Sequence, residues 1–391
     1  MSLRNVGDLK DEVSGIISGT NLNKVTGLYK AFQRAARTLV QKADVSEATA
    51  KQNLTLYDGV YDYEISENLF GGALIDIRPQ GVTRYYGESV TKVPMSDFDR
   101  KKSYALFDGT KVTFEYKDGV PIMRVASVRP MARTILDVMN DDSGWTAGGS
   151  ASGLAEDRTV FYDSNGSLRF TLTGASSGTL EKTLSTALNL EEYEDVAVGF
   201  LAFRLPDDAT ASQLTSMTLR IGNSNAIYDS VSVTEGFLGA WTVGEWLLVA
   251  FDMAASASTG SVDWTATDYV QLSMAHSATM VNVRVGGLWL ALPSPHEAIY
   301  QTAAIFLENG ARAKTITDVD TEIVLGDSAF NLYAYECALA IAKQTTQVKK
   351  AGELQRTLYG GEGPGEPGLY VQYRGDNPSQ ELRTVGSYYE N

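Results

Sequence analysis

The sequence predicts a β-rich α+β chain, in which a discontinuous body of helices and strands carries an inserted all-β jelly-roll sandwich. Three observations on residues 143–292 favour the insertion. This stretch holds all five tryptophans: Trp145, Trp241, Trp246, Trp264 and Trp289. Its short β-branched and aromatic runs alternate with turns of Gly, Ser, Asp and Asn, as in sandwiches and jelly rolls. Its sixteen acidic and six basic residues give a net charge of −10, out of −15 for the chain.

The predicted domain order follows from these changes in composition. Residues 1–142 form the N-terminal part of the body, and 143–292 form the inserted jelly-roll domain. Residues 293–359 form the C-terminal helical part of the body, and 360–391 form an extended tail. A chain of 391 residues has the length for two or three domains with sizeable cores.

The clearest helix is predicted over 21–42, where apolar residues recur at spacings of three and four. Arg34 and Arg37 lie on its polar side together with two lysines. This basic side is either a solvated surface or a docking surface for an acidic partner. Arg34 and Arg37 are therefore candidate subunit-interface residues.

The rest of the body contains both strand-like and helix-like hydrophobic patterns. From 54 to 129 apolar residues recur with a period close to two, and Asp-Gly turns at 58–59, 108–109 and 118–119 join the predicted strands. Helices are predicted over 295–309 and again from Asp327 or Ser328 to Leu358.

The tail is rich in Gly and Pro and contains one strand-like piece, LYVQY. It has too little apolar surface to fold alone, so we expect a neighbouring subunit to order it. Tyr370 and Tyr373 in this piece are the second pair of candidate subunit-interface residues.

Residue types that carry catalysis or bind metals are scarce. His276 and His296 are the only histidines and Cys337 is the only cysteine, so no metal-ligand spacing, catalytic triad or disulfide framework is present. We expect both histidines at the surface and Cys337 in a core. The sequence therefore predicts no enzyme activity, no metal and no cofactor.

Charge and hydropathy exclude two further classes. An isoelectric point near 4.7 argues against a protein that binds nucleic acid through a basic field. No apolar run reaches the ~20 residues that a bilayer requires, and the first residues lack a signal-peptide pattern. We therefore expect synthesis in a cytoplasm, no membrane contact and no sequence-specific nucleic acid.

The tryptophans raise a binding hypothesis, because exposed aromatic rings can stack on the C–H face of a pyranose. Trp241 in GAWTVG and Trp264 in VDWTAT lie beside turn residues and are the candidate glycan-binding residues. The alternative is that these two rings close the ends of the sandwich, while Trp246 and Trp289 lie in its core.

The two ends of the chain resemble a group of tailed-bacteriophage virion proteins. The resemblance lies in DLKDEVSGIISGTNLNKVTGLYKAFQRAARTLVQKAD with LYDGVYDY and FGGALIDIRPQG, and in GPGEPGLYVQYRGDNPSQELRTVGSYY. The helix that begins EIVLGDSAFNLYAYECALAIAK is similar to the ring-forming helices of head-to-tail adaptors. The middle resembles carbohydrate-binding jelly rolls by its pattern alone.

The resemblance implies a virion structural protein made in the host cytoplasm. It would form a homo-oligomeric ring at the head–tail neck, as an adaptor or collar, with portal, neck or tail proteins as partners and the jelly roll projecting outward. The alternative function is a glycan-binding adhesin, or a receptor-binding or baseplate component, with surface glycans as ligands. A third hypothesis is an enzyme that acts on polysaccharide, but the sequence shows no active site for it.

Overall fold

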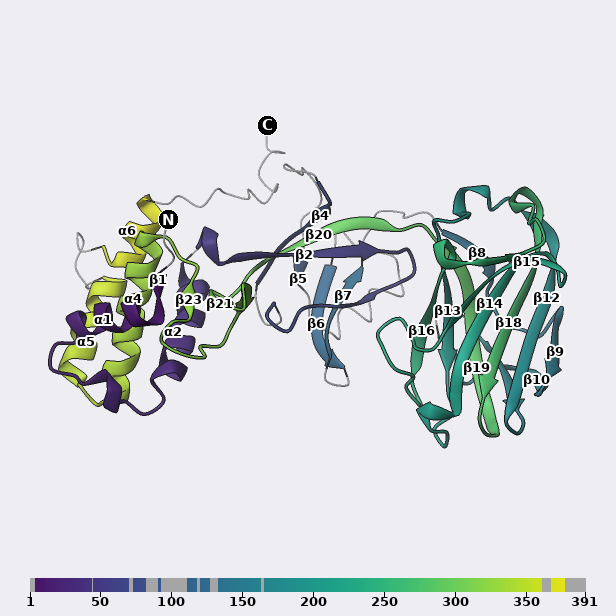
Figure 1. Ribbon diagram of the computed structural model, residues 1–391, viewed down its shortest axis with the longest axis horizontal. Helices are drawn as coiled ribbons and strands as arrows, with labels where there is room; N and C mark the ends of the chain where they lie inside the picture. The colour runs from purple at the N-terminus through teal and green to yellow at the C-terminus, as the bar shows by residue number, and fades with distance from the viewer. Residues whose placement is uncertain are drawn as a thin grey trace. The chain divides into compact units, whose positions relative to one another are not determined.

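The structure is a computed structural model that describes residues 4–43, 45–69, 73–81, 91–92, 111–117, 120–126, 133–162, 165–360 and 367–376 (Figure 1). The predicted turns at 108–109 and 118–119 and most of the predicted tail lie outside these ranges. The described residues form two compact units. The first comprises residues up to Leu54, from Tyr63 to Ala126 and from His296 onward, and the second comprises Thr55–Asp62 and the residues between Arg133 and Pro295.

The first unit contains a helical bundle built on α4 (Asp327–Gln344). This helix buries residues all round its circumference, so it needs cover on every side. The covering helices are α1 (Val6–Ile16), α2 (Leu28–Lys42), α5 (Val348–Tyr359) and α6 (Leu369–Asp376). The helix predicted over 21–42 is present as a 3₁₀ turn, Leu22–Lys24, followed by α2. The helix predicted to run to Leu358 is divided between α4 and α5.

Short sheets complete the first unit. The first sheet consists of β1 (Arg4–Asn5), β23 (Glu322–Ile323), β21 (Phe306–Glu308) and β22 (Ala311–Ala313). The second consists of β2 (Thr49–Leu56), β20 (Ser294–Gln301) and β4 (Ala73–Pro79). The third consists of β3 (Asp62–Glu64), β7 (Val120–Ala126), β6 (Lys111–Lys117) and β5 (Thr91–Lys92). The helix predicted over 295–309 is wrong, because β20 and β21 occupy these residues. The antiparallel pairing of β20 with β4, more than 200 residues away, replaces the local helical pattern.

The second unit is a sandwich of two antiparallel sheets of six strands each, counted over the described residues. We call them the β19 sheet and the β18 sheet after a central strand of each. The β19 sheet consists of β10 (Ala151–Asp157), β11 (Ser167–Leu172), β19 (Met280–Ala291), β13 (Val198–Arg204) and β16 (Trp246–Asp252), with β8 (Arg133–Asp137) beside β19. The β18 sheet consists of β17 (Ala257–Thr259), β15 (Ile227–Val233), β14 (Leu214–Ser224), β18 (Thr267–His276), β12 (Ser176–Leu188) and β9 (Trp145–Gly149).

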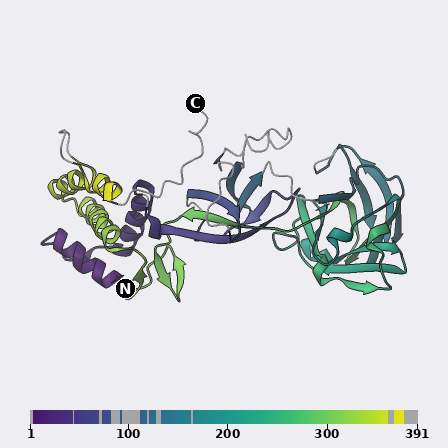
Figure 2. The same cartoon turned by 90° about the horizontal axis from the view of Figure 1, so that it is seen from above.

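Apolar side chains from both sheets meet in one core. Leu201, Phe203 and Val283 enter it from the β19 sheet, and Leu219 and Leu272 enter it from the β18 sheet. Figure 2 shows the two sheets face to face. The predicted β-rich α+β chain with an inserted all-β sandwich is therefore confirmed.

The sandwich unit extends beyond residues 143–292. Strand β8 pairs with β19, and the turn at Asp58–Gly59 belongs to the same unit. The ring of Tyr57, next to this turn, packs against Phe200 at a centroid distance of 5.1 Å, and Phe200 stacks on Trp289 at 5.7 Å. The indole Nε1 of Trp289 donates to the carbonyl oxygen of Asp58 at 3.0 Å. An aromatic cluster thus joins an early segment of the chain to the outer face of the β19 sheet.

Candidate ligand-binding site

The two tryptophans predicted to bind glycans are buried. Trp241 is 7% exposed and Trp264 is 5% exposed. Trp241 packs edge-on against Phe203, and Trp264 donates its indole N–H to Asp229 Oδ2 at 3.1 Å. Neither ring offers a free face, so the prediction that they stack on a sugar is wrong. The alternative interpretation is right that these two rings are structural, and both belong to the core of the sandwich. Its other half is wrong, because Trp246 and Trp289 lie outside that core, on the outer face of the β19 sheet.

Polar and aromatic side chains instead gather on the outer face of the β18 sheet. Glu181, Gln271, Arg220 and Ser230 stand opposite one another on β12, β18, β14 and β15. Their sequence neighbours Leu180, Leu219, Ile221, Val270, Leu272 and Val231 enter the core. Because successive side chains of a strand point to opposite faces, the polar set faces away from the core. We call Glu181, Arg220, Tyr228, Tyr269 and Gln271 the β18 face.

Hydrogen bonds fix these side chains in a chain of contacts. Arg220 Nη1 donates to Gln271 Oε1 at 2.8 Å, and Gln271 Nε2 donates to Glu181 Oε2 at 3.0 Å. The Tyr269 hydroxyl donates to the same Glu181 oxygen at 3.1 Å. The Arg220 guanidinium lies 4.5 Å from the centroid of the Tyr228 ring, within reach of a cation–π contact. The face is therefore organised before any ligand arrives.

The centre of the β18 face is shielded, although it lies outside the sandwich core. Tyr269 and Gln271 are 6% and 7% exposed. Burial first, and then the hydrogen bond to Glu181, raises the pKa of Tyr269 to about 12. Gly222 on β14 stands opposite both Tyr228 and Tyr269, so no side chain separates the two rings on that strand. Arg220 Nε is buried and has no hydrogen-bond partner among the described residues.

Hydroxyl groups extend the polar surface along the strands. The Thr218 and Ser232 hydroxyls lie 2.7 Å apart, and those of Ser177 and Ser273 lie 3.3 Å apart. Each hydroxyl can both donate and accept, so each can exchange its present partner for another hydroxyl. The β18 face thus offers charged, amide, hydroxyl and aromatic groups side by side.

The histidine prediction needs correction for His276, which is 4% exposed. Its Nδ1 lies 3.0 Å from the carbonyl oxygen of Ala278 and therefore donates to it. Nε2 then accepts from the Ser150 hydroxyl at 2.6 Å. The Ser150 backbone N–H is already bonded to the Ser177 carbonyl, so this Ser–His pair lacks an oxyanion donor from its own residue.

Metal and membrane features are absent from the part of the chain that the structure describes. No group of three or more His, Cys, Asp or Glu side chains in it could hold a metal ion. None of its helices is long and apolar enough to span a bilayer. Cys337 is buried in the helical core, as predicted.

The candidate interface residues fall into two groups. Arg34 and Arg37 are exposed on α2. Tyr370 and Tyr373 are 5% and 8% exposed and lie on helix α6, packed against the chain's own helices. The Tyr370 hydroxyl donates to the buried Glu336 carboxylate at 2.8 Å. The prediction of an extended piece that offers these tyrosines to a neighbour is therefore wrong.

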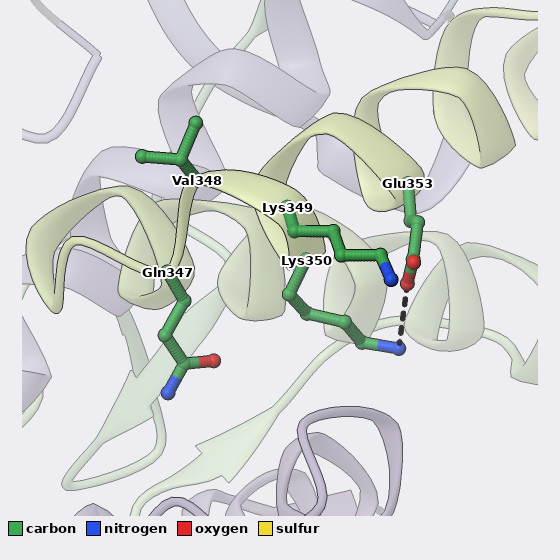
Figure 3. A pocket seen from close by; sticks show the side chains of 5 residues that line it. All are labelled: Gln347, Val348, Lys349, Lys350 and Glu353. Atoms are coloured by element: carbon green, nitrogen blue, oxygen red, sulfur yellow. Dashed lines mark ion pairs between the residues drawn. The ribbon is translucent and has the colours of Figure 1, made fainter.

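A surface pocket of about 420 Å³ lies on the helical unit, at the start of α5 (Figure 3). Its lining residues are Gln347, Val348, Lys349, Lys350 and Glu353. Lys350 pairs with Glu353 at 3.8 Å, and Gln347 donates to Thr20 at 2.9 Å. Five neighbouring residues of one helical segment make a less specific arrangement than the β18 face, which draws on several strands.

Comparison with known proteins adds fold likeness only. No protein-family profile and no curated protein matches the chain. One similar solved structure is the family 11 carbohydrate-binding module from Clostridium thermocellum in complex with a β-1,3-1,4-mixed-linked tetrasaccharide. The match has 11% identity and a TM-score of 0.30, and it covers 42% of this chain and 97% of that chain. The family 30 module of a cellulosomal cellulase of Clostridium thermocellum has 14% identity, 40% and 98% coverage and a TM-score of 0.32. An exo-β-agarase has 10% identity, 42% and 25% coverage and a TM-score of 0.30. At such values the likeness carries no argument about ligand or activity.

Proposed function

We propose that the sandwich binds a neutral saccharide on the β18 face. The observation that carries this proposal is the hydrogen-bonded set of Glu181, Gln271 and Arg220, flanked by Tyr228 and Tyr269. Carboxylate, amide and guanidinium groups can each bond two neighbouring hydroxyls, which is the pattern that a pyranose presents. The partly exposed ring of Tyr228 supplies apolar surface for its C–H groups.

The network also lowers the cost of binding. A free surface arginine or glutamine loses roughly 0.5–1.5 kcal/mol of side-chain freedom when a ligand immobilises it. Gln271 is already held on both sides, by Arg220 and by Glu181, so most of this cost is met during folding. These features support recognition of a polar ligand over an apolar one.

The experiment is a binding titration of the full chain with neutral oligosaccharides of different linkage, including a β-1,3-1,4-linked glucan tetrasaccharide. We expect Tyr228→Ala and Glu181→Gln each to weaken binding about tenfold, equivalent to about 1.4 kcal/mol. Arg158→Gln is the matched control, because Arg158 is 76% exposed in its side chain and lies outside this face, and it should leave the affinity unchanged. Thermal melting followed by tryptophan fluorescence checks that the variants fold. Failure of every neutral saccharide to bind, or equal affinity in all the variants, would overturn the proposal.

The biological setting of this binding stays a prediction from the sequence. Resemblance of the two ends of the chain to tailed-phage virion proteins favours a particle component, in which the sandwich would meet surface glycans. The exposed pair Arg34 and Arg37 on α2 is available for the predicted contacts between subunits. The neck position, the ring and the partner proteins rest on that resemblance alone.

A further inference from the structure

The β19 sheet carries a row of arginines on its outer face. Arg169 on β11 stands opposite Arg284 on β19, and Arg284 stands opposite Arg204 on β13. Trp246 on β16 stands opposite Arg204 and continues the row. The neighbours Leu168, Phe170, Val283, Val285, Phe203 and Leu205 belong to the core, so the row faces away from it. We call Arg169, Arg204, Arg284 and Trp246 the arginine row.

This placement of charge is unfavourable for the sandwich on its own. Like charges directly opposite on neighbouring strands destabilise a sheet. Within residues 143–292, which hold six basic residues against sixteen acidic ones, three of the six stand side by side. Such a concentration of positive charge on an acidic domain indicates attraction for an anion.

The carboxylates beside the row offset its charge only in part. Asp157 Oδ2 accepts from Arg284 Nε, and Asp207 Oδ1 accepts from Arg204 Nη2, each at 2.9 Å. Arg169 is exposed and makes no ion pair among the described residues. In addition, Arg204 Nε is buried without a hydrogen-bond partner in the same part of the chain. The guanidinium of Arg169 therefore remains available to a ligand.

An aromatic ring completes the row. Trp246 is partly exposed, and its centroid lies 5.9 Å from that of Tyr162. Gly286 lies beneath it, since a Cβ there would approach the indole to 3.1 Å. A glycine at this point lets the indole lie close to the sheet. A flat ring in the same row as an exposed arginine suits an extended ligand that has both an apolar face and an anionic group.

We propose that the arginine row is a second binding site, for a saccharide that carries a carboxylate or a sulfate. The anionic group would bind the exposed guanidinium of Arg169, and a sugar ring further along the row would pack against Trp246. An acidic peptide would satisfy the charge but would not need the indole. The site lies on the opposite sheet from the β18 face, and it does not depend on the function proposed there.

The test is a titration of the full chain at low salt with three probes: a galacturonate oligosaccharide, a sulfated oligosaccharide of equal length and a poly-glutamate peptide. We expect at least one anionic saccharide to bind, with affinity falling as salt is added. Binding of the first or the second identifies carboxylate or sulfate as the anionic group. Poly-glutamate that binds as tightly as both would show recognition of charge alone and would overturn the proposal.

Variants place the binding on the row. Arg169→Gln should weaken binding of the anionic saccharide at least fivefold. Arg158→Gln is the matched control, because Arg158 is 76% exposed in its side chain and is paired with Glu156 outside the row. Tyr228→Ala on the β18 face should leave anionic binding unchanged, which separates this site from the first one. Absence of binding by both anionic saccharides, or equal losses in Arg169→Gln and Arg158→Gln, would refute the site.

Discussion

Two Arg–Asp ion pairs in the sandwich offer a matched test of burial. Asp157 accepts from Arg284 and Asp207 accepts from Arg204, each with a nitrogen–oxygen distance of 2.9 Å. The carboxylate side chains differ in exposure, at 6% for Asp157 and 79% for Asp207. The perturbation is Asp→Asn at each position, which removes the negative charge and keeps the shape.

The expected losses follow from the surroundings of each carboxylate. Asp157 also accepts from the backbone N–H and the hydroxyl of Thr159, at 2.8 and 2.6 Å. Removing one partner of a buried pair leaves the other charge uncompensated, at a cost of about 3–5 kcal/mol. We therefore expect Asp157→Asn to lower the free energy of unfolding of the sandwich by about 3 kcal/mol. Asp207→Asn should cost at most about 1 kcal/mol, because solvent screens exposed pairs.

The assay is urea denaturation of the full chain, followed by tryptophan fluorescence. All five tryptophans lie in the sandwich, so the signal reports this unit and not the helical one. Equal losses for the two variants would refute the argument from burial.

A pH series adds a sign test. Burial alone would raise the pKa of Asp157, but hydrogen bonds from Thr159 and Arg284 outweigh it and hold the pKa well below 3.8. A carboxyl whose pKa is lower in the folded state stabilises the fold at any pH above its unfolded-state pKa. This contribution is lost as the pH falls towards the folded-state pKa. The difference in free energy of unfolding between the wild-type chain and Asp157→Asn should therefore shrink below about pH 4. A gap that stays constant down to pH 2 would contradict the assignment.

Three further predictions concern other parts of the chain. Gly222→Ala should destabilise the sandwich by about 2 kcal/mol, because a Cβ there would approach backbone atoms at 2.2 Å; a fluorescence melt identical to wild type would contradict this. Tyr370→Phe should remove a hydrogen bond to the buried Glu336 carboxylate and cost the helical unit about 1.5 kcal/mol, seen by far-ultraviolet circular dichroism with tryptophan fluorescence unchanged; a loss confined to the fluorescence signal would refute it. Replacing both Arg34 and Arg37 by Ala should weaken self-association in sedimentation velocity without lowering the melting temperature, and a lower melting temperature or unchanged association would count against an interface role.

The local hydrophobic pattern predicted those helices and strands whose conformation does not depend on a distant segment of the chain. The apolar stripe of α2 and the alternation in strand β6, Lys111–Lys117, are both visible in the sequence and present in the structure. A helix was wrongly predicted over 295–309 because Ile299 and Phe306 occur at helical spacing. The pairing of β20 with β4 decides its conformation, and that partner is too distant for local reasoning. In α6 the β-forming residues of LYVQY are overridden, because Tyr370 and Tyr373 lie three apart and share the buried side of one helix.

The candidate site was harder to predict than the fold. Its sequence signal is a polar residue between two core residues, as in Leu219-Arg220-Ile221 and Val270-Gln271-Leu272. That signal marks an outward position, but it does not show that Arg220 stands opposite Gln271. Register between strands depends on long-range packing, so the assembled β18 face is visible only in the structure. The tryptophans misled for the opposite reason, because flanking turn residues do not reveal whether a large ring folds back into the core.

The contact between Trp289 and the turn at Asp58 sets an order of events during synthesis. The two residues are 231 positions apart in the chain, so the turn leaves the ribosome long before its partner strand exists. Closing so long a loop is slow, because many chain conformations must be given up before the contact forms. Until Tyr57 docks, the part of Phe200 that it covers would be open to solvent, with only Phe237 and Trp289 packed against that ring. A chain that reaches this stage with its aromatic surface uncovered would be prone to aggregate if the protein were made faster than it folds.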